Sequence, residues 1–594
     1  LLYETQQDVL ELKAAVTGGR RAMAEKGVSL PIIAQVTVDQ HARMQIFNTD
    51  IHAALVTVAG IGIDVFGINC SIGPDLMTPT VEKLGRYSPL PISVIPNAGL
   101  PVSEAGKTVF RFPPEAFAEH MRRFISEHGV SVVGGCCGTT PEHIRRVVEA
   151  VRELTPKPRT PDSRLYVSGP QRAVLLDASE ELIRFGERLN VRGSKKVREA
   201  VENDTDIDHE TLDTVVREQV EGLGCPVIDV CMDSNQVNTV DTLKQVVHIQ
   251  TTDFGAAMCL DSFQVDALAE AVKVYPGRPI INSISMEEAS PGVLKIDAVI
   301  EATQDHCPLY VALCTGPQGP GATADEKLDL ATQLIERARD THGVAPGRLF
   351  VDVNVFPIGS ESKEDMNFAA ETLEGIRRVK ERFPDTHTIL GVGNLTNGLA
   401  GKPYMRKVLT SVFLDEARKR GLDAAIVNPD HYVFVADLDA EDYERGRRIV
   451  RERDMDAFAD LEEIAEQKKG IVRERRSSYD DLGVEDAVCE KVKDGFKERV
   501  AGTLEYKGHT YAYEDAIVCQ VAEAMDRHEP LDFINAYLMA AMQELGDRFG
   551  RGEASLPHLL RSADVMRQAM GFLEAYMRNE AGLDLHSEVQ YRGT

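Results

Sequence analysis

The sequence has no long apolar run, no excess of positive charge and no glycine motif for nucleotides. No stretch approaches the roughly 20 apolar residues of a membrane-spanning helix, and the first residues do not resemble a signal peptide. Acidic residues outnumber basic ones by 94 to 66, for a net charge of −28, whereas nucleic-acid binding needs clustered Lys and Arg. Neither GxxxxGK[ST] nor GxGxxG occurs. We therefore expect no membrane or nucleic-acid partner and no phosphate-binding loop.

The ten cysteines lack the compact spacing of a disulfide-rich domain. Their scatter through apolar segments is typical of proteins from a reducing compartment, so we expect a cytoplasmic enzyme. A length of 594 residues suggests three or four domains. The hydrophobic content of 43% and the charged content of 27% are ordinary for globular proteins.

Residues 1–155 alternate between apolar runs and amphipathic segments. This alternation predicts parallel strands with helices outside them, as in an α/β barrel. A closed eight-stranded barrel takes about 250 residues, and this segment is much shorter. We expect the first strands of that barrel to be absent from the sequence, and we expect the proline-rich residues 155–161 to begin a linker that covers 156–180.

Three cysteines follow two apolar, strand-like runs of this first region. Cys70 follows the run 61–68, and Cys136 and Cys137 follow the run 130–133 between flanking glycines. Parallel α/β barrels carry their chemistry where strands end. A single buried cysteine is usually an inert small hydrophobe, but three thiolates suit zinc and leave a fourth tetrahedral position open for a substrate. The pattern therefore favours a zinc site.

The motifs GINCSIGP, PNAGLP and GGCCGTTPEH resemble the homocysteine-binding module of cobalamin-dependent methionine synthases, a module shared in outline with betaine-homocysteine methyltransferases. The resemblance implies that Cys70, Cys136 and Cys137 bind zinc. It also favours Glu4 over Asp39 as the group that holds the ammonium of homocysteine. Both acids can instead be ordinary strand-end caps.

Between residues 181 and 438, acidic and amide residues end a series of apolar runs. One aspartate at a strand end is usually a helix cap, but a series predicts a ring of carboxylates and amides around one barrel mouth. Such groups can pair with the donors and acceptors along the edge of a pterin. The runs end at Asp229, Asp261, Asn282, Asp352, Asn394 and Asn428, and Glu187 and Asn190 lie in the preceding GERLN stretch.

This series resembles the pterin-binding barrel of methionine synthases and of corrinoid iron–sulfur protein methyltransferases. Members often have GERTN and GLSN where this sequence has GERLN and GVGN, a change that could alter local packing. The resemblance implies catalytic roles for Asp261, Asp352 and Asn394, with Asn394 following N5 of the folate as that nitrogen gains its proton. Lys402 or Arg406 is a candidate partner for the glutamate tail. The implied pterin contacts are Glu187, Asp261, Asn282, Asp352 and Asn394, with Asn190 and Asp229 as neighbours.

The alternation of strands and helices stops in the last part of the chain. Residues 439–478 are predicted to form a connecting helix and linker. Residues 479–594 are predicted to form a four-helix bundle, with helical segments at 483–498, 512–527, 531–549 and 556–578. Methionines here usually pack the core, but the stretch 536–566 resembles the helical cap over methylcobalamin. The resemblance implies that Phe549 and Leu556 cover the cobalt face.

The predicted activity is methyl transfer from 5-methyltetrahydrofolate through cobalamin to zinc-activated homocysteine, with methionine and tetrahydrofolate as products. The DxHxxG motif of the cobalamin-binding domain is not found. We therefore expect cobalamin to be held mainly by such a domain in the full-length protein, and only weakly by this piece. Two alternatives remain open: a corrinoid-dependent methyltransferase with another methyl donor, and a non-enzymatic scaffold with a Cys136–Cys137 redox switch. The expected fold is α/β multidomain, with two (β/α)8 barrels, the first lacking its N-terminal strands, and a helical cap.

Overall fold

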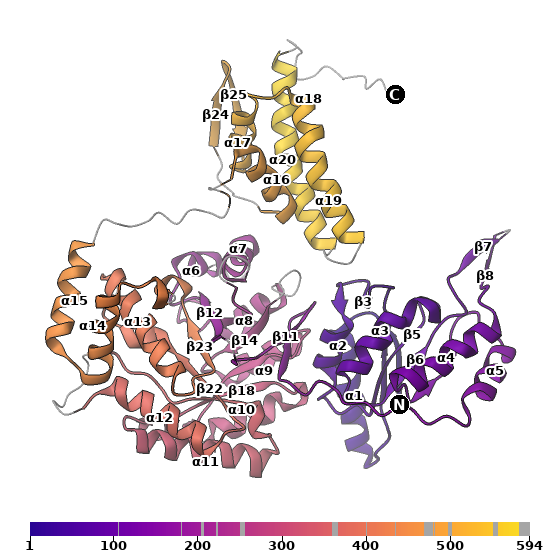
Figure 1. Cartoon of the computed structure of the whole chain (residues 1–594), viewed down its shortest axis with the longest axis horizontal. Coiled ribbons are helices and arrows are strands. Elements are labelled where there is room, and N and C mark those ends of the chain that lie inside the picture. The colour runs from indigo at the N-terminus through magenta and orange to yellow at the C-terminus, as the bar shows by residue number, and fades with distance from the viewer. Residues whose placement is uncertain are drawn as a thin grey trace. The chain divides into compact units, whose positions relative to one another are not determined.

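The computed structural model separates the chain into two compact units, residues 1–471 and 472–594, and each is described by itself (Figure 1). The residues that it describes are 1–104, 106–179, 181–202, 207–220, 224–249, 256–358, 366–399, 401–433, 435–468, 479, 482–496, 502–550 and 556–580.

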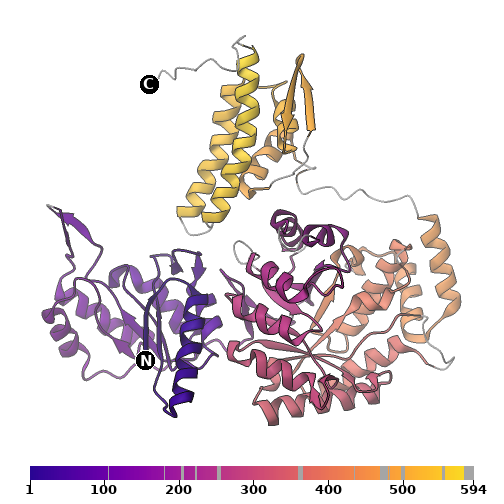
Figure 2. The same cartoon turned by 180° about the vertical axis from the view of Figure 1, so that it is seen from behind.

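The first unit begins with a five-stranded parallel sheet of order β1-β2-β5-β6-β9. Because every crossover contains a helix, the carboxyl ends of all five strands lie along one edge of the sheet. The β7–β8 hairpin projects from this part of the chain (Figures 1 and 2). The strands are Leu2–Gln6 (β1), Ile33–Val36 (β2), Val65–Asn69 (β5), Ile92–Ile95 (β6) and Val132–Val133 (β9), with hairpins Arg43–Met44 and Thr49–Asp50 (β3, β4) and Val102–Glu104 and Lys107–Val109 (β7, β8).

The helices of this region are amphipathic and bury one face against the sheet. Val9, Leu12 and Val16 of α1 belong to the same buried cluster as Phe66 of β5 and Ile92 of β6. This packing explains the alternation of apolar runs and amphipathic segments in the sequence. The helices are Val9–Lys26 (α1), Ile51–Val58 (α2), Pro74–Tyr87 (α3), Pro114–His128 (α4) and Pro141–Val151 (α5).

Eight parallel strands then form a closed barrel of order β12-β13-β14-β15-β18-β21-β22-β23. Pairing of Phe185 with Ile426 joins the first and last strands. The closed barrel confirms the fold predicted for residues 181–438. The strands are Ile183–Asn190 (β12), Val227–Cys231 (β13), Ala257–Asp261 (β14), Ile280–Ile284 (β15), Leu309–Leu313 (β18), Leu349–Asp352 (β21), His387–Gly391 (β22) and Ala424–Val427 (β23).

Helices surround the barrel, and short elements occupy its loops. The helices are Lys195–Val201 (α6), His209–Val220 (α7), Thr239–Ile249 (α8), Val265–Val274 (α9), Lys295–Thr303 (α10), Ala324–His342 (α11), Phe368–Arg382 (α12) and Pro403–Arg418 (α13). The loops contain the short strand pairs Glu288–Ser290 and Val293–Leu294 (β16, β17) and Thr315–Gly316 and Gly319–Pro320 (β19, β20). The 3-10 helices are Gln304–His306 (η1), Pro346–Arg348 (η2), Val392–Thr396 (η3), Pro429–His431 (η4) and Val435–Asp437 (η5).

The barrel interior is closed at one end by a hairpin that the sequence did not predict. The hairpin Tyr166–Ser168 (β10) and Ala173–Leu175 (β11) lies within the segment 156–180. Its Val167 and Val174 share a buried cluster with Phe185 and Phe350 of the barrel strands. Aromatic and β-branched side chains therefore fill the interior of the barrel. A ligand-binding site in this barrel must then lie at the carboxyl ends of the strands.

Helices Ala440–Glu452 (α14) and Met455–Gln467 (α15) follow the barrel within the first unit. They were predicted as part of a connector, and they pack on the barrel. Ile449, Val450, Ala457 and Leu461 are buried in the main barrel core cluster. The remaining residues of the predicted connector, 469–478, lie outside the described part of the chain.

The second unit is helical, as predicted, and contains one hairpin that was not predicted. Helices α16, α17, α19 and α20 share a buried core that includes Val488, Val521 and Leu573. Strands Gly502–Tyr506 (β24) and His509–Tyr513 (β25) form the hairpin, so the segment 512–527 begins as strand. The helices are Val484–Asp494 (α16), Ile517–Ala524 (α17), Pro530–Phe533 (α18), the π-helix Ile534–Leu538 (η6), Met539–Gly550 (α19) and Leu556–Glu580 (α20). Of the helices that the structure describes, none combines the length and apolar character needed to cross a membrane.

Candidate metal centre and barrel-mouth site

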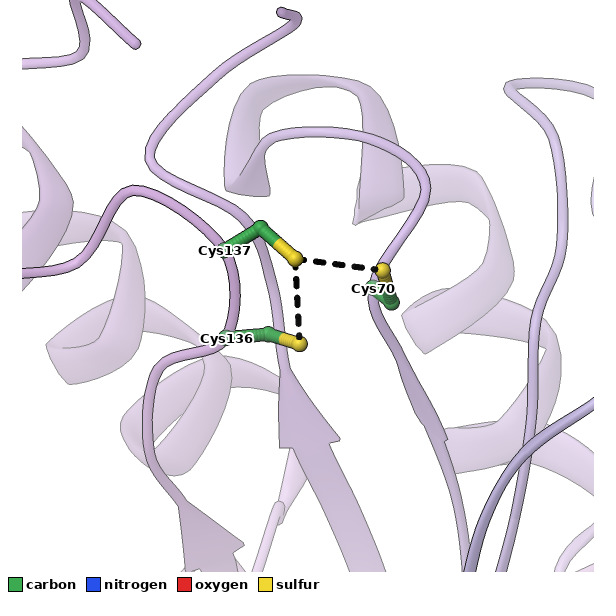
Figure 3. Close-up of side chains that lie close together, drawn as sticks. All are labelled: Cys70, Cys136 and Cys137. Carbon is green, nitrogen blue, oxygen red and sulfur yellow. Dashed lines mark hydrogen bonds between the residues drawn. The ribbon is translucent and has the colours of Figure 1, made fainter. Parts of the chain in front are cut away.

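The three predicted cysteines converge on one point at the carboxyl edge of the first sheet. Cys70 follows β5, and Cys136 and Cys137 follow β9, and their sulfur atoms point toward one another (Figure 3). The Sγ of Cys137 lies 3.8 Å from that of Cys70 and 3.9 Å from that of Cys136. All three sulfur atoms lie within 4.8 Å of one another, the only group of this kind found among the described residues.

These distances fit a tetrahedral zinc ion. Thiolates at about 2.3 Å from zinc lie about 3.8 Å apart in tetrahedral geometry, which is close to the distances found here. Without a cation, burial and the neighbouring Cys70 raise the pKa of the Cys136 thiol to about 12. Without a metal the Cys136 thiol is therefore protonated at neutral pH, and zinc binding would have to release that proton.

The backbone after β6 joins the two cysteine loops. The amide of Cys70 donates to the carbonyl of Ile95 at 3.0 Å, and the amide of Cys136 donates to the carbonyl of Pro96 at 2.8 Å. Cys70 has a φ of 64°, a conformation that costs a non-glycine residue about 1–3 kcal/mol. The last residue of β6 and the first residue of the PNAGLP motif are thus each hydrogen-bonded to one of the two cysteine loops.

Asn97 of the same motif supports the paired cysteines directly. Its side-chain oxygen accepts a hydrogen bond from the amide of Cys137 at 3.2 Å, and Asn97 is 4% exposed. Gly138 follows with a φ of 78°, and a β-carbon there would collide with the ring of Phe110. These contacts explain why asparagine and glycine stand at these positions beside the thiols.

The two acids considered for the substrate ammonium differ in their surroundings. Asp39 accepts hydrogen bonds from the amides of His41 at 2.8 Å and Arg43 at 3.0 Å, so it caps its own turn. Glu4 is exposed at the end of β1, and its carboxylate has no hydrogen bond or ion pair to any residue that the structure describes. Asn69, which precedes Cys70, accepts from the amide of Thr5 at 2.7 Å and so ties the end of β1 to the cysteine loop.

At the mouth of the closed barrel, acidic side chains from neighbouring strands lie close together. Burial raises the pKa of Glu187 to about 7 and that of Asp261 to about 7. Burial, with the nearby Asp261, also raises the pKa of Asp229 well above its usual range. The side-chain nitrogen of Asn282 donates to Asp229 at 3.4 Å. The series of strand-end residues therefore meets at one site, as the barrel geometry requires.

The other predicted residues of the mouth have distinct positions. Asp352 is 7% exposed, accepts from the amides of Asn354 at 2.8 Å and Gly391 at 3.2 Å, and has its pKa raised to about 6 by burial. Asn394 lies in η3 and is exposed. Asn190 accepts from the amide of Arg192 at 2.9 Å and so stabilises its own loop.

The structure adds mouth residues that sequence reasoning missed. Asp233 accepts from the hydroxyl of Ser262 and from the amide of Phe263, both at 2.7 Å. Lys295 and Arg192 lie close enough to Asp261 to oppose the rise of its pKa. Asp233 follows the apolar run of β13, a signal that could have found it. Nothing in the local sequence marks Lys295, because it begins a helix after a long loop.

The two cations predicted to bind the glutamate tail of the folate have different contacts. Lys402 forms an ion pair with Glu462 of α15. Arg406 donates to the hydroxyl of Thr396 at 3.2 Å and lies near Glu187, where its charge opposes the rise that burial causes in the pKa of that carboxyl. In the second unit, Phe549 is 41% exposed near the end of α19. Leu556 begins α20, and its side chain lies outside the described part of the structure.

Comparisons with known proteins match the three regions in turn. Residues 1–151 match the Homocysteine S-methyltransferase family, 186–428 the Pterin binding enzyme family and 513–574 the B12 binding domain family. Methionine synthase of Mycobacterium tuberculosis is 32% identical over 582 residues, which cover 97% of this chain and 47% of that protein. The chain is homologous to methionine synthases.

This homology confirms the resemblance predicted from the sequence motifs. Methionine synthase of Mycobacterium leprae is also 32% identical, over 587 residues. The chain spans about half the length of these relatives, 47% in both cases. Among solved structures, a dihydropteroate synthase of Xanthomonas albilineans matches with a TM-score of 0.31 and 16% identity, over 52% of this chain and all of that one. The closed order of the eight parallel strands itself identifies the barrel.

Proposed function

We propose that the chain forms the substrate-binding part of a cobalamin-dependent methionine synthase. The proposed overall reaction moves a methyl group from 5-methyltetrahydrofolate to homocysteine, giving tetrahydrofolate and methionine, and cobalamin would supply the methyl carrier between them. The observation that carries this proposal is the convergence of three thiols within 4.8 Å at a strand-end edge, in a chain whose next region matches pterin-binding enzymes.

In the first region, the side chains of this chain bind and orient homocysteine. Cys70, Cys136 and Cys137 would hold zinc, which lowers the pKa of a bound thiol and leaves a thiolate nucleophile at neutral pH. Glu4 accepts a hydrogen bond from the substrate ammonium, because its carboxylate is exposed and lies on the strand that Asn69 ties to the cysteine loop.

We also propose that the five-stranded sheet of this first region is the C-terminal part of a (β/α)8 barrel.

In the closed barrel, the carboxylates and amides bind the pterin ring. Asp229, Asp261 and Asn282 lie on three successive strands, and their oxygens can accept the ring N–H groups in one plane. A pKa of about 7 for Glu187 and Asp261 lets these groups exchange a proton near neutral pH. In this proposal Asn394 hydrogen-bonds N5 as that nitrogen becomes protonated and the methyl group leaves, a role supported by its exposed place in η3, directly after β22.

The helical second unit would cover cobalamin, with Phe549 and Leu556 over the cobalt face. The match to the B12 binding domain family supports this role. A cobalamin-binding domain in the full-length protein is the expected partner. The cysteines are free thiols, which supports the proposal of a reducing, cytoplasmic location.

Elemental analysis and calorimetry with Cys136→Ala test the proposal. We expect the variant to lose stoichiometric zinc and homocysteine binding while keeping its affinity for 5-methyltetrahydrofolate, because the two sites lie on separate sheets. Cys519→Ala, a half-buried cysteine of the second unit, is the matched control and should retain zinc. Reduced wild-type protein without zinc would instead favour the redox scaffold. Zinc binding without folate binding would favour a different methyl donor.

A further inference from the structure

Phe263 is a large apolar side chain that is exposed to solvent at the mouth of the barrel. It lies two residues after Asp261 and is 67% exposed. Its amide donates to one oxygen of Asp233, and the hydroxyl of Ser262 donates to the other. The backbone is therefore fixed while the ring stays uncovered, an arrangement that leaves an aromatic face available to a ligand.

Two cations from different loops lie over this ring. The guanidinium carbon of Arg192 lies 5.6 Å from the ring centroid, and the Nζ of Lys295 lies 5.5 Å from it. The Nε of Arg192 donates to the backbone carbonyl of Asp233 at 2.8 Å, so Asp233 holds both Arg192 and Phe263. The three side chains form one cluster at the rim of the mouth, which we name the Phe263 rim.

Lys295 is the unusual member of the Phe263 rim. It is 7% exposed, and its ammonium has neither a hydrogen bond nor an ion pair to any residue within the described ranges. It is also the first residue of α10, where the helix dipole disfavours a cation. Glu287, Asp261 and Asp233 contribute only longer-range attraction. A buried ammonium in such a place is poorly compensated unless a negatively charged ligand group approaches it.

We propose that the Phe263 rim binds the benzoylglutamate part of a reduced folate. The benzoyl ring stacks on Phe263, and a glutamyl carboxylate lies between Arg192 and Lys295. This inference rests on the proposed function. The benzoylglutamate can reach Phe263 only if the pterin ring to which it is attached occupies the mouth beside Asp261. An arene that carries carboxylates matches an aromatic face flanked by two positive charges.

The contacts of the alternative cations favour this side of the mouth. Lys402 is engaged by Glu462, and Arg406 lies beside Glu187 and bonds Thr396. Within the described residues Arg192, like Arg406, donates a hydrogen bond only from Nε, here to Asp233, but Arg192 also lies over the exposed ring of Phe263. Arg192 therefore keeps its two terminal nitrogens for a carboxylate.

Calorimetry with two ligands tests this assignment. The ligands are 5-methyltetrahydrofolate and 5,6-dimethyltetrahydropterin, which lacks the benzoylglutamate. We expect Phe263→Ala to weaken folate binding about tenfold and Arg192→Met to weaken it about threefold, since Arg192 is exposed. Binding of the pterin should change less than twofold in both variants. Arg339→Met, an exposed arginine paired with Asp340, is the control and should bind both ligands like wild type.

Each remaining outcome is decisive. Equal losses for the two ligands would mean that the Phe263 rim only supports the barrel loop, and the proposal would be overturned. A loss of folate preference in Lys402→Met but not in Arg192→Met would move the tail to the other side of the mouth and would also overturn it. If wild type binds neither ligand, the proposed function fails. If wild type binds both ligands equally, only the benzoylglutamate assignment fails.

Discussion

Replacing Asn97 by alanine should weaken zinc binding although all three thiol ligands remain. Asn97 supplies the acceptor for the amide of Cys137 and is almost fully buried. In the metal-free protein the loop can relax, and this amide can bind water. Zinc binding forces the loop back into a geometry in which the amide has no acceptor, so the bound state alone carries the cost.

The magnitude follows from that unpaired amide. A buried donor without its acceptor costs about 1–3 kcal/mol, and each 1.4 kcal/mol corresponds to about tenfold in affinity. Asn97→Ala should therefore lower zinc affinity by about 5- to 100-fold, in the range found when groups that orient metal ligands are removed.

Competition with a chromophoric chelator at fixed pH measures this change. Gln35→Ala is the matched control, because Gln35 is a buried amide of the same sheet that bonds Ser93 at 2.6 Å rather than a cysteine loop. It should lower the free energy of unfolding while leaving zinc affinity within twofold of wild type. Unchanged zinc affinity in Asn97→Ala, or an equal loss in both variants, would refute the role assigned to Asn97.

Two further predictions concern buried ionisable groups. Burial lowers the pKa of Lys13 to about 7, so the unfolded state binds more protons between about pH 7 and 10, and stability rises with pH there. The free energy of unfolding in urea is measured at pH 7.5 and 9.5. Its increase between these pH values should be smaller in Lys13→Met than in wild type by up to about 2–3 kcal/mol, and an unchanged pH dependence would contradict this. Burial raises the pKa of Asp352 to about 6, so 5-methyltetrahydrofolate binding should weaken as the pH falls through 6. Asp352→Asn should bind about tenfold more weakly and lose the Asp352 contribution to this pH dependence, and a variant that follows the wild-type profile would exclude Asp352 from the site.

The strand-end residues were predictable because parallel strands share one direction. An apolar run followed by cysteine, aspartate or asparagine places that side chain at the carboxyl edge, so Cys70, Cys136 and Asp261 could be assigned from the sequence alone. The hairpins β10–β11 and β24–β25 were missed, since their few residues are stabilised by the cores that they contact.

Contacts between residues far apart in the sequence could not be predicted from the sequence either. Lys402 and Arg192 are both cations in loops of the same barrel. The ion pair of Lys402 with Glu462 depends on how α15 packs on the barrel. The position of Arg192 over Phe263 depends on the pairing of β12 and β14 with the strand between them, β13. No local pattern encodes either contact.

The sequence by itself determined the order of the modules, the residue types of the thiol trio and the series of polar strand ends, because these follow from local periodicity and motif spacing. Tertiary structure alone decided that the three sulfur atoms lie within bonding range of one ion and that Asn97 holds their loop. It also decided that Lys295, whose ammonium has no hydrogen bond or ion pair to a described residue, lies over the exposed ring of Phe263. The physical reason is that pairing of strands brings together residues that are far apart along the chain, and only then do burial and charge act between them.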